Sequence, residues 1–249
     1  MRITEGLDID FSLIIPTRDR ISKLQGCLLS FFNKAQRKGN NEAIVIVDHD
    51  DIGIRSFSDF VLYHQMNVKI LTVWRSEMMI RDYNNYGAQC SLGKYIWMLN
   101  DDYEMTTDHW DALLKKKIED FCGSNGDRVC YVMVDDSTHS PSNWNCLDSK
   151  GCCCPIQTRE SVEALNGVMP WQINSWGADI ALYHIYRNLP KPRILDCVKD
   201  VKVLHYCRHN NTAEVDEISR RIERISQKRG HINGQEMAEY VDRLRGMLR

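Results

Sequence analysis

The sequence predicts an α/β fold in which helices cover both faces of a mostly parallel sheet. Short apolar runs alternate with amphipathic segments as far as residue 136, and three of the runs end in acids. Alternation of this kind is typical of parallel sheets, whose strands are buried on both faces. Ligands of such sheets bind outside the carboxyl ends of the strands, so the acids mark a candidate site.

The first strand is expected at residues 11–16, an apolar run that ends at a proline. Further strands are expected at residues 43–51, 68–74, 94–102 and 129–136. Apolar residues at helical spacing predict the intervening helices at residues 21–32, 54–65, 78–92 and 108–121. The strands that end in acids lead to Asp48–Asp51, Asp101–Asp102 and Asp135–Asp136.

The second half of the chain is less regular. Residues 137–170 are rich in loop-forming residues, and a loop of that length in a compact domain is usually functional or mobile. A helix is expected within residues 173–189 and a late strand at 200–210. The chain is therefore divided into a catalytic domain, residues 1–210, and a C-terminal helical extension packed on it, residues 211–249.

Composition narrows the class of protein. A net charge of −2 over 249 residues gives no overall basic character, so nucleic acid is not an expected partner. We find no apolar run approaching the roughly 20 residues that span a bilayer, and acids stand where a signal peptide has its apolar core. The expected location is cytoplasmic. The basic segment 218–229 is interpreted as a solvated helix face, and binding of an anionic acceptor, a membrane surface or a partner protein is left open. The cysteines at 146 and 152–154 match no common zinc spacing.

Asn100-Asp101-Asp102 follows an apolar run directly. Two adjacent carboxylates repel each other, and a bound cation would offset that repulsion. The segment after the first strand, residues 16–22, contains no glycine, so neither a P-loop nor a GxGxxG loop can hold phosphates there. Mg²⁺ or Mn²⁺ held by carboxylates and completed by diphosphate oxygens is the alternative. The plainer interpretation makes these acids the first-turn residues of the next helix.

Three stretches together resemble the GT-A glycosyltransferases of family 2. They are SLIIPTRDR, NYGAQCSLGKYIWMLNDD and SWGADIAL, at residues 12–20, 85–102 and 175–182. The resemblance covers roughly residues 10–210. It implies a GT-A fold, the Rossmann-like fold of nucleotide-diphospho-sugar transferases, and transfer from a UDP- or GDP-type donor to an acceptor that is a glycan, a protein or a lipid-linked group.

Roles follow from the resemblance position by position. It implies that Asp179 is the general base and that Asp102 ligates Mn²⁺ or Mg²⁺, with His205 and Asn100 as further ligands. It implies donor contacts at Thr17, Asp19, Asp48, Asp51, Arg81, Asn85 and Asp101. From the residues themselves, Trp171 and Trp176 are candidates for stacking on an acceptor sugar, with core packing as the alternative. Asp135, at a strand end, is a further candidate for acceptor contact.

Two positions depart from the family pattern. Asn100 replaces the first Asp of the D-x-D metal motif, and Gly177-Ala178 precede Asp179 without the usual Glu. One base and one metal site predict a single displacement that inverts the anomeric centre. The alternatives are a non-catalytic nucleotide-sugar-binding module and a sugar nucleotidyltransferase, although the latter would need a glycine-rich loop after the first strand.

Overall fold

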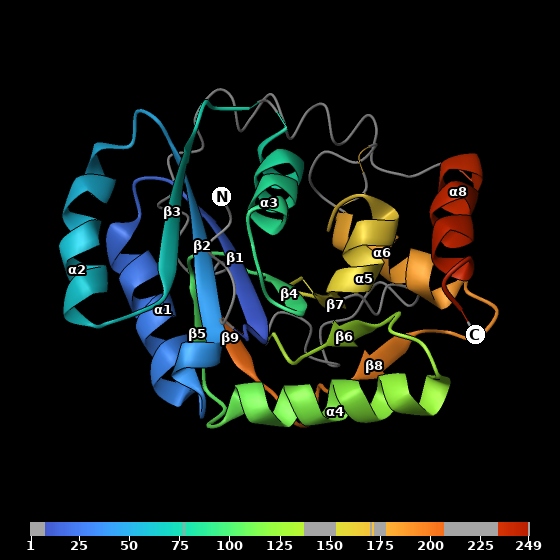
Figure 1. The fold of residues 1–249 in the computed structure, drawn as a ribbon. Helices are drawn as coiled ribbons and strands as arrows, with labels where there is room; N and C mark the ends of the chain where they lie inside the picture. Colours follow the sequence, from blue (N-terminus) through green and yellow to red (C-terminus); the bar gives the residue numbers. More distant parts are fainter. Residues whose placement is uncertain are drawn as a thin grey trace.

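A computed structural model of the chain describes residues 8–76, 78–136, 153–169, 171, 178–206 and 234–248 (Figure 1). The strands are β1 Phe11–Thr17, β2 Asn41–Asp48, β3 Val68–Val73, β4 Tyr95–Met98, β5 Tyr103–Met105, β6 Tyr131–Met133, β7 Ile156–Thr158, β8 Ile194–Asp196 and β9 Val203–His205. The helices are α1 Ile21–Lys34, α2 Phe57–Tyr63, α3 Met79–Gln89, α4 Trp110–Asn125, α5 Arg159–Leu165, α6 Ala178–Arg187 and α8 Gly234–Arg245, with 3₁₀ turns η1 Lys38–Asn40 and η2 Ile52–Ser56.

The main sheet has the order β3-β2-β1-β4-β7-β6-β8. Strands β1 to β4 run parallel, β7 is antiparallel to both β4 and β6, and β6 is parallel to β8. The predicted mostly parallel sheet covered by helices is therefore confirmed. The late strand expected at residues 200–210 is shorter, β9, and it pairs antiparallel with β5 in a separate two-stranded sheet.

Two apolar cores lie on opposite faces of the main sheet. Helices α1, α2 and α4 contribute to one core together with β5 and β9, and helices α3, α5, α6 and α8 contribute to the other. Neighbouring residues of β1 point alternately to the two sides, with Leu13 and Ile15 in the first core and Ile14 in the second. A strand buried on both faces needs apolar residues in succession, which explains the continuous apolar runs of the sequence.

Two glycines of the NYGAQCSLG stretch allow close packing against β1. A side chain at Gly93 would place its Cβ 2.6 Å from the backbone nitrogen of Ser12 and 2.8 Å from the backbone carbon of Phe11. A side chain at Gly87 would place its Cβ 2.6 Å from Ile14 and 2.9 Å from Ile46. Only glycine therefore lets α3 and the turn before β4 approach the sheet this closely.

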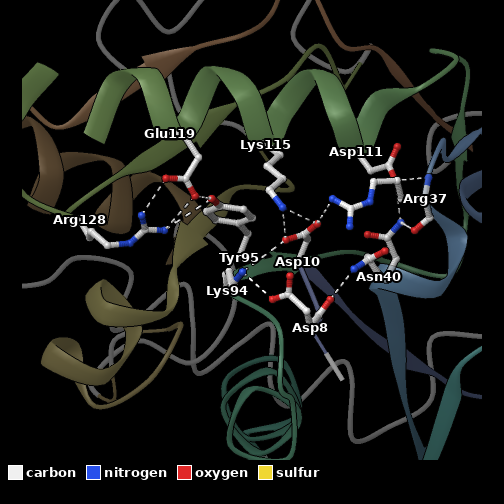
Figure 2. Close-up of polar contacts among 11 residues, drawn as sticks. Asp8, Asp10, Arg37, Asn40, Lys94, Tyr95, Asp111, Lys115, Glu119 and Arg128 are labelled. Atoms are coloured by element: carbon white, nitrogen blue, oxygen red, sulfur yellow. Dashed lines mark hydrogen bonds and ion pairs between the residues drawn. The ribbon is translucent and has the colours of Figure 1, made fainter. Parts of the chain in front are cut away.

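Ion pairs fasten α4 to the amino ends of the strands (Figure 2). Asp10, just before β1, is almost fully buried and accepts two hydrogen bonds from the Lys115 ammonium of α4, at 2.7 and 2.9 Å. Its carboxylate also lies within 3.8 Å of Lys94 and 3.7 Å of Arg37. Asp111, near the start of α4, accepts the backbone N–H groups of residues 36 and 37. These contacts fix the edge of the sheet opposite the acidic strand ends.

Helix α8 packs on α5 and α6 through Tyr240, Val241 and Leu244, all buried in the second core. Residues 207–233, which contain most of the predicted boundary region and the basic segment, lie outside the described residues. The division into domains 1–210 and 211–249 stays a prediction. Among the helices that the structure describes, none combines the length and apolar character needed to cross a bilayer.

We expect Asp10→Asn to destabilise the fold, because it leaves the Lys115 ammonium beside a buried neutral group. Removing one partner of a largely buried pair costs roughly 3–5 kcal/mol, and the partial exposure of Lys115 should reduce the loss to about 1–3 kcal/mol. Urea unfolding of the purified protein measures it. Asp120→Asn, which breaks the exposed Lys116–Asp120 pair on the same helix, is the matched control and should change stability by less than about 0.5 kcal/mol. Equal losses in the two variants would contradict the argument.

Candidate active site

Three loops converge at the carboxyl ends of β1, β2 and β4. Together with the last residues of β1 and β2 they carry positions 17–20, 48–51 and 100–102, so acids that the sequence placed at separate strand ends share one edge of the sheet. Because neighbouring parallel strands run in the same direction, their carboxyl ends lie at the same edge of the sheet. The contacts between the loops are made by charged side chains.

Asp101 is fully buried and connects the loop after β1 with the turn after β4. Its Oδ2 accepts a hydrogen bond from the Thr17 hydroxyl at 2.6 Å, and its Oδ1 lies 2.7 Å from Nη2 of Arg20. Burial raises the pKa of Asp101, while the Arg20 charge and the Thr17 hydrogen bond oppose that rise. A carboxylate that is removed from water needs such partners, so Asp101 fixes the conformation of the loop that carries Arg20.

Asp102 faces His205. Its Oδ1 lies 3.3 Å from Nε2 of His205, and both side chains are almost fully buried, at 6% and 8% exposure. Burial by itself raises the pKa of Asp102, but the hydrogen bond and charge of His205, with the charges of Arg20 and Lys23, outweigh it and leave the pKa below its ordinary value. Asp102 is thus held as a carboxylate beside an imidazole, a pair suited to a divalent cation.

The two-stranded β5–β9 sheet brings His205 to this position. Tyr103 and His205 are paired across the two strands, and their rings stack with centroids 4.2 Å apart. The backbone N–H of Tyr206 donates to the carbonyl of Asp102 at 3.1 Å. The hydroxyl of Tyr206 also bonds Glu104. His205 is therefore oriented by its strand register, its neighbouring ring and the residue that follows it.

The residues at this edge fit a hexacoordinate Mg²⁺ or Mn²⁺. A separation of 3.3 Å between the Asp102 oxygen and the His205 nitrogen is close to the roughly 3 Å between adjacent ligands of an octahedral ion with bonds of about 2.1 Å. Asn100, the other predicted ligand, is exposed. Within the described ranges, no three His, Cys, Asp or Glu side chains gather as a complete metal cage. Such a cation would keep several positions for phosphate oxygens and water.

A second ionic cluster surrounds Asp48. Arg18 donates from Nη1 to Asp48 and to Asp50, both at 2.7 Å. The hydroxyl of Tyr83, on α3, also bonds the buried Asp48. The Arg75 guanidinium lies 3.9 Å from Asp48. The carboxylate of Asp48 thus organises two arginines at the strand edge, and its predicted contact with the nucleoside stays a prediction.

Asp51 and Asp19 shape the loops of the same edge. Asp51 is nearly buried, and its two oxygens accept the backbone N–H groups of Asp19 and Gly53 at 2.9 and 3.0 Å. Asp19 itself has a positive φ of 52°. Residues in that region of backbone space are uncommon, and Asp tolerates it better than most. The side chain of Asp51 therefore holds a strained turn after β1.

Arg81 and Asn85, both on α3, contact Trp171, a predicted acceptor residue, and Met169 shortly before it. The side-chain amide of Asn85 donates to the Met169 carbonyl at 3.1 Å and accepts the Met169 N–H at 2.9 Å. Arg81 donates from Nη1 to the Trp171 carbonyl at 2.7 Å, and its guanidinium lies 5.3 Å from the centroid of the Trp171 ring. These two residues bind the chain itself, and their predicted donor contacts remain predictions.

The remaining predicted residues occupy different surroundings. Asp179 lies in the first turn of α6, a helix of the second core, whereas β5 and β9 belong to the first core. Asp135 forms a bridge with Lys202, and its carboxylate lies 3.8 Å from the Lys202 ammonium. Trp176 lies outside the described residues. The structure therefore brings together Thr17, Asp101, Asp102 and His205, and it places Asp179 on a separate element.

Sequence reasoning missed the basic and aromatic side chains of this edge. Arg18 and Arg20 flank Asp19 in the loop after β1. Two basic residues after one strand and acids after three others could have indicated that these ends form ion pairs. Trp74, directly after β3, is 78% exposed, and its ring centroid lies 3.8 Å from that of His49, directly after β2. An exposed tryptophan following a predicted strand was the signal for this second feature.

The sequence of residues 12–151 matches the model of the family described as Glycosyl transferase family 2. The chain belongs to glycosyl transferase family 2. It is a glycosyltransferase, as the resemblance of its three stretches implied, and the matched region contains β1 to β6 with the loops that carry Arg20, Asp101 and Asp102. No curated protein sequence matches the chain.

Solved structures of glycosyltransferases share the fold. The mannosyltransferase PcManGT from Pyrobaculum calidifontis, in complex with GDP-Man and Mn²⁺, has a TM-score of 0.60 at 14% identity, over 98% of this chain and 73% of its own. S. aureus TarS 1-349, in complex with UDP-GlcNAc, has a TM-score of 0.59 at 14% identity, over 97% and 74%. GalNAc-T7 with UDP, GalNAc and Mn²⁺ has a TM-score of 0.58 at 17% identity, over 81% and 44%. The expected GT-A fold is confirmed.

The Arg18–Asp50 pair gives a measurable titration. The hydrogen bond and charge of Arg18 lower the pKa of Asp50 to about 2, from an ordinary value of 3.8. We expect the Asp50 carboxyl carbon, followed by NMR, to titrate near pH 2 in the wild-type protein and to move back toward 3.8 in Arg18→Gln. Asp108, whose pKa is lowered by its hydrogen bond with Lys34, makes no contact with Arg18 and should be unaffected by the substitution. An Asp50 midpoint unaffected by Arg18→Gln would show that the pair does not form in solution.

Proposed function

We propose that this glycosyltransferase moves a sugar from a nucleotide-diphosphate donor to an acceptor hydroxyl, with a divalent cation and with inversion of the anomeric centre. The observation that carries the proposal is the Asp102–His205 pair, in which two buried side chains with metal-binding atoms meet at the carboxyl end of the sheet. The complexes of TarS with UDP-GlcNAc and of PcManGT with GDP-Man and Mn²⁺ support a UDP- or GDP-type donor.

The electrostatics of the carboxyl edge suit a departing diphosphate. A bound cation supplies positive charge where negative charge accumulates on the leaving group. Asp102 and His205 would hold that cation, and Asn100 is the third proposed ligand. Arg20, whose side chain is 35% exposed, lies beside both carboxylates and presents its guanidinium to the same region. Arg20 would therefore counter the charge of Asp101 and Asp102 when no cation is present and attract the anionic donor.

The acceptor hydroxyl must lose a proton as it attacks. Asp179 is the proposed base, because it is the one carboxylate of its motif and stands in the first turn of α6, where a helix N-terminus stabilises negative charge. A base on one side of the sugar and a leaving group on the other give a single in-line displacement. Transfer of this kind inverts the configuration at the anomeric carbon.

A non-catalytic nucleotide-sugar-binding module is the second candidate. The exposed amide Asn100 in place of an acid favours it, because it weakens the metal site. The sugar nucleotidyltransferase is less well supported, since the loop after β1 has no glycine. Incubation with UDP-GlcNAc or GDP-Man and Mn²⁺ separates the first two: a transferase releases free sugar slowly through attack by water, and a binding module releases none.

We expect Mn²⁺ together with UDP or GDP to raise the melting temperature of the wild-type protein. Binding at 100 times the dissociation constant adds about 2.7 kcal/mol to the apparent stability, which is roughly 5–10 °C for a chain of this size. Asp102→Asn should lose most of that shift, because an amide is a weaker ligand than a carboxylate. Asp120→Asn, exposed on α4, should keep it. A full Mn²⁺-dependent shift in Asp102→Asn would rule out the proposed ligand.

We expect Asp179→Asn to lower the rate of transfer by roughly 10²–10⁴-fold, the usual contribution of a general base. Nucleotide affinity, measured by the same Mn²⁺-dependent thermal shift, should stay within about twofold, because the base acts on the acceptor. Steady-state kinetics with radiolabelled donor provide the measurement. Wild-type turnover in a folded Asp179→Asn variant would exclude Asp179.

A further inference from the structure

Side chains from two separate helices hold the backbone of Trp171. Its carbonyl accepts a hydrogen bond from Nη1 of Arg81, on α3, at 2.7 Å. Its N–H donates to the hydroxyl oxygen of Tyr240, on α8, at 3.0 Å. Its indole Nε1 donates to the carbonyl of Asn166 at 2.7 Å. All three polar groups of Trp171 are thus engaged, so both the backbone position and the ring direction of this residue are specified.

The two side chains that hold Trp171, Arg81 and Tyr240, are themselves held by neighbouring residues. Asp82 binds the guanidinium of Arg81 at 2.7 and 2.8 Å, which leaves Nη1 directed at Trp171. Tyr240 is 2% exposed, packs among α5 and α6 residues, and lies under the guanidinium of Arg243 at 5.3 Å from its ring centroid. Arg243 also donates to the carbonyl of Leu165 at 3.4 Å. The position of the Tyr240 hydroxyl is therefore fixed by the packing of its ring and by the contact with Arg243.

The engaged residue is a partly exposed tryptophan eight positions before Asp179 in the sequence. One side of its ring faces the Arg81 guanidinium. A tryptophan used only for core packing would be buried, whereas Trp171 is partly exposed. Aromatic rings that stand in fixed positions and remain partly exposed suit stacking on the apolar face of a sugar.

We propose that Tyr240 is a positioning residue of the acceptor subsite, acting through Trp171. Helix α8 thereby completes the site from a part of the chain beyond the region that matches the family, residues 12–151. Trp171 contacts the acceptor sugar, and Tyr240 and Arg81 fix its orientation from either side. The proposal rests on the proposed function and assigns the substrate class of this subsite as a glycoside acceptor.

Tyr240→Phe is the decisive variant, because it removes only the hydroxyl that accepts the Trp171 N–H. Tyr63→Phe is the matched control, since Tyr63 is 82% exposed on α2. With isotope-labelled tryptophan, NMR follows the amide proton of Trp171 among the six tryptophans. Trp171→Phe assigns its signal. Loss of one hydrogen bond should make this amide exchange roughly tenfold faster in Tyr240→Phe and leave it unchanged in Tyr63→Phe.

The functional measurement uses p-nitrophenyl glycosides as probe acceptors, with UDP-GlcNAc or GDP-Man as donor. We expect Tyr240→Phe to raise the KM for the glycoside, or its Kd by calorimetry, about tenfold, with donor hydrolysis and Mn²⁺-dependent nucleotide affinity within about twofold of wild type. A merely structural role would change donor and acceptor parameters together, and that result would overturn the proposal. Unchanged exchange of the Trp171 amide, unchanged glycoside affinity or no glycoside binding by the wild type would overturn it too.

The two proposals fail in different ways. If the wild-type chain hydrolyses no nucleotide sugar and transfers none, the proposed function is wrong. The exchange rate of the Trp171 amide and the calorimetric affinity for the glycosides then still decide whether Tyr240 positions a sugar-binding tryptophan. If transfer occurs but Tyr240→Phe leaves acceptor use unchanged, only the positioning role is excluded.

Discussion

The burial of Asp101 is the constraint on which the carboxyl edge depends. A carboxylate with no access to water must find donors, and the Thr17 hydroxyl and the Arg20 guanidinium are the donors that it has. Thr17 ends β1 and Arg20 lies in the loop that follows, so the position of one acid in the turn after β4 determines the path of a loop more than 80 residues earlier. Arg20 is in turn brought beside Asp102, and the two loops form one charged surface.

The proposed metal pair, Asp102 and His205, depends on the pairing of β5 with β9. His205 comes from the far end of the described catalytic region and reaches Asp102 through the short β5–β9 sheet, whose register sets Tyr103 opposite His205. The turn that presents Asp101 and Asp102 leads directly into β5, so one strand both continues the acidic turn and receives the histidine. Three residue pairs are enough to place an imidazole beside a carboxylate because Tyr103, Met105 and Val203 anchor the ribbon in the first core.

Much of the first half of the fold could be predicted from sequence, because its signals are local. The apolar runs of β1 to β4 are contiguous, acids follow the runs of β2 and β4 directly, and parallel pairing then brings those acids to one edge. The glycines at 87 and 93 are also local signals, because the close approach of their segments to β1 leaves no room for a side chain. The family resemblance was carried by the same local stretches.

The rest of the site depends on contacts between residues far apart in the sequence. Nothing near Asn85 or Arg81 indicates that they bind Met169 and Trp171, 84 and 90 positions away. The antiparallel insertion of β7 between β4 and β6 has no periodicity of its own, because β7 is only three residues long. Asp51 reads as a turn acid, yet both of its oxygens are used by backbone groups.

The ion pairs around Asp10 and α4 (Figure 2) lie at the amino ends of the strands, and the loops that follow β1, β2 and β4 lie at the opposite, carboxyl ends. The anchoring ion pairs and the proposed donor site therefore lie at opposite rims of one sheet. Substitutions of exposed residues in the carboxyl-end loops would leave the contacts of Asp10 with Lys115, and of Asp111 with residues 36 and 37, in place. A library aimed at new donors would therefore vary exposed positions such as Ile52 and Trp74 and keep Asp48 and Asp51, whose contacts hold the neighbouring loop.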